Sequence, residues 1–103
     1  MFLPLFILLS CSVERDMEQA KHALYEHDVA SAERHYRSVL QKKPQYVPAL
    51  EGLGWLYHLS GKTEPANRIF DRCLVIEEEN AECLRGQASV ALSKGKNNVA
   101  RTY

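Results

Sequence analysis

A spacing of 34 residues, at which residues of similar size recur, constrains the fold of this chain more than any other feature. A shift of 34 positions places small residues on small residues and aromatic residues on aromatic residues; the aligned sets are Ala20 with Gly54 and Ala88, Ala32 with Ala66 and Ala100, Tyr36 with Phe70, Leu40 with Leu74, and His27 with Gly61 and Gly95. A period of this length is typical of stacked supersecondary units, each of which buries its apolar face against its neighbours.

Within each period the apolar residues follow the spacing of amphipathic helices, and no segment alternates as a strand would. We therefore predict an all-α fold. The expected helices cover residues 14–26, 30–42, 47–60, 64–77 and 81–94, with a further helical stub from about 98. Gly61 should end one helix in the left-handed conformation, and Pro65 should lie in the first turn of the next helix, where its missing N–H is no loss.

The middle unit carries the clearest motif, and the motif names a family. Its residues are Leu50, Leu53, Gly54 and Tyr57, followed by Ala66 and Phe70. This order resembles the tetratricopeptide (TPR) repeat, in which small residues lie where two antiparallel helices cross. The resemblance implies a right-handed superhelical stack of helix hairpins, a TPR-like α-solenoid, over residues 11–103. Its units would be about 13–46, 47–80 and an incomplete 81–103.

The third unit begins an apolar face that no capping helix follows, although solenoid arrays normally need polar caps for solubility. Val99, Ala100 and Tyr103 continue this face. Two explanations stay open. The chain belongs to a longer protein, or its open end binds a partner or a second copy.

The N-terminal residues form a separate element. Met1 to Leu9 is an unbroken apolar run, too short to span a bilayer but of the length of a signal-peptide apolar core. The segment Leu8 to Cys11 resembles a bacterial lipobox, which implies a signal peptide over residues 1–10 and lipidation of Cys11. No Lys or Arg precedes the run, so the alternative is an apolar arm packed on the first hairpin. The lipobox implies a lipid-anchored, periplasm-facing protein of the bacterial envelope, with the outer membrane favoured; the uncleaved alternative implies a cytoplasmic protein.

Function in a TPR-like array would lie on the concave face made by the first helix of each unit. By the family pattern, the protein-binding positions are Met17, Lys21, Leu24, Glu51, Trp55, His58, Arg85, Ser89 and Leu92. Trp and Arg are enriched among interface hot spots, so Trp55 and Arg85 are the first candidates for ligand contact. The alternative for Trp55 is that it covers the neighbouring helix.

Nothing in the sequence indicates catalysis or a cofactor. His22 and His27 are five residues apart, which misses the spacing that places two ligands on one helix face. No nucleophile–base pattern and no glycine-rich phosphate loop occurs, so we expect no enzyme, no metal and no cofactor. Lys plus Arg equals Asp plus Glu at 13 each, which disfavours a nucleic-acid partner.

Cys73 and Cys83 fall on consecutive predicted antiparallel helices. Two readings stay open. In an oxidising compartment they would form a disulfide, and otherwise each is an ordinary buried thiol.

We therefore expect a scaffold that binds a peptide or helix of another protein and assists the assembly of an envelope complex, in a pilus, secretion or cell-wall system. The unfinished third unit motivates the alternative, an oligomerisation or regulatory module of a larger protein or enzyme.

Overall fold

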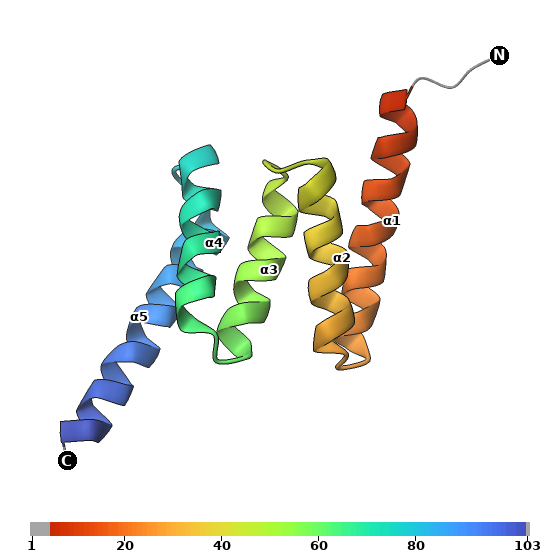
Figure 1. Cartoon of the computed structure of the whole chain (residues 1–103). Helices are drawn as coiled ribbons and strands as arrows, with labels where there is room; N and C mark the ends of the chain where they lie inside the picture. The colour runs from red at the N-terminus through yellow and green to blue at the C-terminus, as the bar shows by residue number, and fades with distance from the viewer. Residues whose placement is uncertain (1–4, 103) are drawn as a thin grey trace. The chain divides into compact units, whose positions relative to one another are not determined.

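The computed structural model of the chain describes the backbone of residues 5–102 and the side chains of residues 12–95 (Figure 1). This part of the chain contains five α-helices and no strand. The helices are α1 (Leu5–Tyr25), α2 (Val29–Lys42), α3 (Val47–Leu59), α4 (Thr63–Ile76) and α5 (Ala81–Thr102). The predicted all-α class is confirmed.

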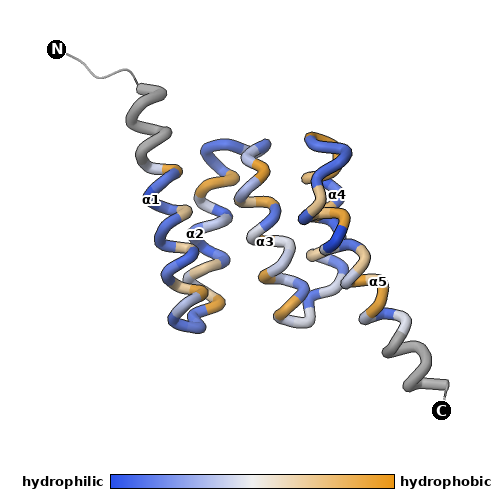
Figure 2. Tube along the Cα trace, turned by 180° about the vertical axis from the view of Figure 1, so that it is seen from behind, coloured by the Kyte–Doolittle hydropathy of each residue, from blue (hydrophilic) through white to orange (hydrophobic). Residues whose placement is uncertain are grey.

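The helices fall into two compact units, residues 1–49 and residues 50–103. In the first unit, α1 and α2 form an antiparallel hairpin with a core of Val13, Ala20, Ala32, Tyr36 and Val39. Asp28 caps the N-terminus of α2, because its carboxylate accepts a hydrogen bond from the backbone N–H of Ser31 at 3.1 Å. Along α2 and α4, hydrophobic segments recur between hydrophilic ones, as expected of helices with one buried face (Figure 2).

The second unit is built around Phe70, whose side chain is 0% exposed. Gly54 of α3 and Gly86 of α5 both lie against the Phe70 ring. A Cβ atom added at either glycine would lie within 3.0 Å of ring atoms, so these two positions accept no side chain without a shift of the core. The aromatic ring of α4 thus fills the space that two glycines leave open. This confirms the prediction that Gly54 lies at a helix–helix contact, and Ala66 is also fully buried.

The turns that end α1 and α3 share one conformation. Gly61 has φ +79°, as predicted, and His27, which stands 34 positions earlier, has φ +60°. In both turns a backbone N–H bonds back to the helix, from Asp28 to Ala23 and from Lys62 to Tyr57, each at 2.8 Å. This left-handed residue satisfies carbonyl groups at the helix end. The 34-residue repeat therefore recurs in the backbone conformation at this position.

The structure corrects the C-terminal part of the predicted repeat. Helix α5 continues through Gly95 to Thr102, so there is no separate stub from about 98. Glycine permits a left-handed turn but does not impose one, and no proline follows Gly95 to start a new helix. Ala88 is exposed, although its repeat equivalents Ala20 and Gly54 are buried. Gly86, two positions earlier, is the residue that contacts the core.

At the N-terminus, α1 begins at Leu5 rather than at 14. The helix therefore includes Cys11 and residues 5–10 of the predicted signal peptide, whereas residues 1–4 and the side chains of residues 5–11 lie outside the described part. Among the described residues, no helix is both long enough and apolar enough to cross a membrane.

Candidate protein-binding surface

In the second unit, Trp55 of α3 lies at the centre of an aromatic and cationic cluster. Its ring packs edge-on against Phe70 and against His58, with a centroid separation of 5.8 Å in each case. The guanidinium of Arg85, from α5, lies 5.7 Å from the centroid of the Trp55 ring. An Arg at this distance is attracted by the electrons of the ring face. Trp55 is half-buried and Arg85 is exposed, so the pair joins the core to the surface.

The indole N–H of Trp55 is buried and has no hydrogen-bond partner among the described residues. A buried donor without an acceptor costs about 1–3 kcal/mol, and such groups are uncommon in folded proteins. Trp55 therefore contributes packing to this surface at the expense of one unsatisfied polar group.

Asn80 fixes the start of α5 beside α3. Its Oδ1 accepts a hydrogen bond from the backbone N–H of Cys83 at 2.8 Å, which caps the N-terminus of α5. Its amide donates to Glu51 of α3 and to Glu77, each at 2.9 Å. One side chain therefore joins α3 and α5, the two helices that carry the candidate binding residues of the second unit.

Arg85 is held in its orientation by its own helix. Its Nη2 donates to both carboxylate oxygens of Glu82 at 2.7 Å. The side chain of Arg85 is nevertheless 66% exposed. An exposed ion pair of this kind adds little stability, so its main effect is to position the guanidinium over Trp55.

The predicted binding residues are distributed over both units. Arg85 and Leu92 are exposed, and Glu51, Trp55, His58 and Ser89 are half-buried in the second unit. In the first unit, Lys21 and Leu24 are exposed, but Met17 is only 8% exposed and belongs to the core. The structure brings Trp55 together with His58 and Arg85, and it joins Glu51 to the start of α5 through Asn80.

Cys73 of α4 and Cys83 of α5 form a disulfide and are both fully buried. Of the two readings left open by the sequence, the structure has the bonded one. The bond links the first turn of α5 to the last turn of α4 and lies close along the chain to Asn80. It therefore restrains the end of α5 from which Arg85 projects.

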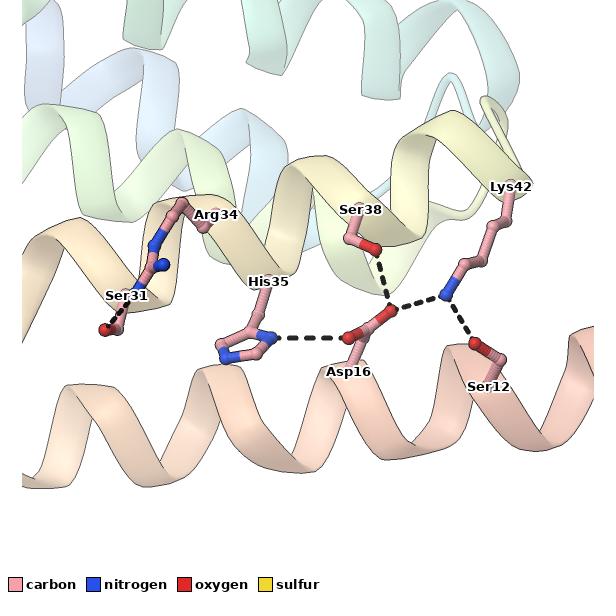
Figure 3. Close-up of polar contacts among 7 residues, drawn as sticks. All are labelled: Ser12, Asp16, Ser31, Arg34, His35, Ser38 and Lys42. Atoms are coloured by element: carbon pink, nitrogen blue, oxygen red, sulfur yellow. Dashed lines mark hydrogen bonds and ion pairs between the residues drawn. The ribbon is translucent and has the colours of Figure 1, made fainter.

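A second polar cluster joins α1 to α2 in the first unit (Figure 3). The carboxylate of Asp16 accepts hydrogen bonds from Ser38 Oγ and Lys42 Nζ, each at 2.8 Å, and lies 3.3 Å from His35 Nδ1. Lys42 also donates to Ser12. Partial burial acts to raise the pKa of Asp16, but the hydrogen bonds from Lys42, Ser38 and His35 outweigh it and lower the pKa below 3.8.

Neither the role of Asn80 nor this cluster was predicted from the sequence. An Asn just before a helix start is a recognised N-cap signal, so Asn80 was detectable as a cap, although its bond to Glu51 was not. His35, Ser38 and Lys42 lie at i, i+3 and i+7 on one helix face, which indicates a polar stripe. Nothing in the sequence pairs that stripe with Asp16.

No protein-family model matches this chain, and no curated protein matches it. Among the described residues, no group of three or more His, Cys, Asp or Glu side chains could hold a metal ion. The surface around Trp55 and Arg85 is the candidate site, because side chains from two helices meet there and remain partly exposed.

Proposed function

We propose that this protein is a tetratricopeptide-type adaptor that binds a peptide or helix of another protein. One observation carries the proposal: Trp55 and Arg85, from two different helices, form a single aromatic–cation pair that is partly accessible. Rigid aromatic rings and guanidinium groups are the side chains that most often dominate binding energy at interfaces. Exposed Leu92 and half-buried Ser89 extend the surface of α5 beyond this pair.

We also propose that the helix hairpins stack as a TPR-like α-solenoid. Three features support a right-handed superhelical stack of the repeats 13–46, 47–80 and 81–103. They are the 34-residue period, the left-handed turn shared by His27 and Gly61, and the placement of Phe70 between Gly54 and Gly86. These features are those expected where successive helix pairs nest against one another.

We further propose that the protein is tethered to a bacterial envelope membrane, through lipid on Cys11, and assists assembly of an envelope complex. The apolar run before Cys11 supports this, and the Cys73–Cys83 disulfide is weakly consistent with an oxidising compartment. Fatty-acid labelling in cells tests the tether, because Cys11→Ser should abolish incorporation.

The binding surface is tested by photo-crosslinking in the native cells. A photoreactive residue placed at Ser89 should give discrete protein adducts, and the same residue at Arg68, exposed on α4, should give none. Trp55→Ala should remove the adducts formed from position 89. The proposal fails if both positions give the same adducts, if neither gives any, or if Trp55→Ala leaves the adducts unchanged.

A second candidate function, self-association, is favoured by an apolar stripe on α5. Leu84 and Leu92 are 49% and 67% exposed, and the small residues Ala88 and Ala91 between them are exposed as well. These residues lie at helical spacing and form a second apolar face besides the one buried against α4. Sedimentation velocity tests this function: Leu84→Glu with Leu92→Glu should convert a dimer into a monomer.

A further inference from the structure

The connection between α2 and α3 lies at the same end of the first unit as the apolar N-terminal segment. Lys42, the last residue of α2, donates hydrogen bonds to Ser12 and Asp16 of α1. Helix α1 has 21 residues and α2 has 14. Figure 1 shows the N-terminal turns of α1 continuing past the end of α2 on the side of this connection. A membrane that anchors Cys11, the residue before Ser12, would therefore face residues 42–46.

No flexible linker separates Cys11 from the folded hairpin. Helix α1 is continuous from Leu5 to Tyr25, and Val13 is 1% exposed, only two residues after Cys11. An anchor at Cys11 would thus hold the hairpin in a restricted orientation, because a continuous helix transmits direction where a flexible linker would not.

The residues of this connection suit a headgroup region. Lys43, Pro44 and Gln45 are exposed, and Tyr46 is half-buried. The ammonium of Lys43 lies 5.7 Å from the centroid of the Tyr46 ring. Together the four residues line a shallow, mostly apolar hollow of about 480 Å³. Tyr rings are enriched at membrane–water interfaces, and Lys side chains attract anionic lipids.

The two ends of the hairpin differ in charge. Lys42 and Lys43 lie at the end near Ser12, where the carboxylate of Asp16 is already bonded to Lys42. At the opposite end, Glu26 and Asp28 are exposed beside the turn at His27. An anionic surface would attract the first end and repel the second.

We infer that residues 42–46 form a membrane-contacting surface that rests on the anionic headgroups of the bilayer to which Cys11 is anchored. This inference rests on the membrane tether proposed above. In this arrangement the His27 turn points away from the bilayer. The partner of the surface is a lipid bilayer containing anionic phospholipid, not a second protein.

Depth-dependent fluorescence quenching tests the inference in the full chain. With Cys73 and Cys83 in their disulfide, Cys11 is the remaining cysteine and can be coupled to a maleimide lipid. The vesicles contain phosphatidylcholine, phosphatidylglycerol and a lipid with a shallow nitroxide quencher. In a Trp55→Phe background, Tyr46→Trp should give a blue-shifted, quenched indole. Tyr25→Trp, at the other end of α1, should stay unquenched.

Charge reversal gives a matched pair of variants that keep Trp55. A basic residue near an anionic surface contributes about 1 kcal/mol to binding, or about fivefold in affinity. Lys43→Glu removes one positive charge and adds one negative charge, so it should weaken binding of the Cys11→Ser chain to the same vesicles by about 25-fold. Lys21→Glu makes the same change on the exposed side of α1 and should leave binding within about twofold. Vesicles of phosphatidylcholine alone should bind both variants equally.

The inference is overturned if position 46 is not quenched, or if position 25 is quenched equally or more strongly. It is also overturned if the two charge reversals have equal effects on binding. Because chemical coupling supplies the tether, these outcomes are independent of lipidation in cells. Failure of the fatty-acid labelling of Cys11 would instead count against the tether itself.

Discussion

The arrangement of Phe70 between two glycines predicts opposite effects for the same substitution at two positions of α5. Gly86 lies against the fully buried Phe70 ring, whereas a Cβ atom at Gly95 would have no neighbour within 4 Å. Gly86→Ala and Gly95→Ala add the same methyl group to the same helix. Only the first places it where the core has no room.

The magnitudes follow from two terms. Replacing Gly by Ala within a helix is favourable by about 1 kcal/mol, which applies to both positions. Overpacking a filled core costs about 1–3 kcal/mol, which applies only at Gly86. Gly95→Ala should therefore raise the free energy of unfolding by up to about 1 kcal/mol, and Gly86→Ala should lower it by up to about 2 kcal/mol. The difference between the two variants isolates the clash with Phe70.

Urea denaturation followed by circular dichroism measures both changes under the linear extrapolation. A double-mutant cycle adds a direct control: Phe70→Leu should cost less in the Gly86→Ala background than alone, because the smaller side chain relieves the clash. If Gly86→Ala unfolds at the same or higher urea concentration than Gly95→Ala, the ring does not fill the space at Gly86. The account of the second unit's core would then be wrong.

Three further predictions address other contacts of the described residues. Replacing Cys73 and Cys83 together by Ser should lower the free energy of unfolding by about 2–3 kcal/mol, because a short loop is no longer closed in the unfolded chain; loss of less than 1 kcal/mol in urea titrations would contradict this. Asp16→Asn should cost about 1–3 kcal/mol at neutral pH. Folding lowers the pKa of Asp16, so its contribution to the free energy of unfolding is fully present above pH 3.8 and is lost as the pH falls through the lower folded-state pKa. The difference in stability between wild type and Asp16→Asn should therefore shrink in acid, as urea titrations at several pH values would show. Asn80→Ala should cost about 1–2 kcal/mol through loss of the α5 cap, whereas the neutral Asn80→Ser keeps a capping oxygen and should lose less; equal losses in thermal denaturation would contradict this.

Local patterns predicted the helices well where start and stop signals agree with the apolar spacing. The ends of α2, α3 and α4 lie within one residue of the predicted bounds, because Gly61 and the residues around Pro44 interrupt the helices locally. The same reasoning failed at Gly95, where glycine permitted a turn that nothing else imposed. It also failed to place the start of α1, because the apolar residues from Leu5 continue the helix without a capping signal.

The candidate site was predictable only in part. The repeat pattern selected Trp55 and Arg85 one residue at a time, from their positions in the first helix of each unit. That the two side chains meet depends on how α3 and α5 pack around α4, and the sequence does not contain that distance. Likewise, the sequence left the pairing of Cys73 with Cys83 open, since a disulfide needs particular positions of both Cβ atoms.

The sequence by itself determined the helical class, the 34-residue period and the left-handed turn at Gly61, because side-chain spacing and glycine conformational freedom act locally along the chain. Only the tertiary structure decided which small residue meets Phe70. The period pointed to Ala88, whereas the packing of α4 against α5 selects Gly86. Contacts between helices depend on helix rotation and crossing, and these are set by all the packed side chains together rather than by any one position.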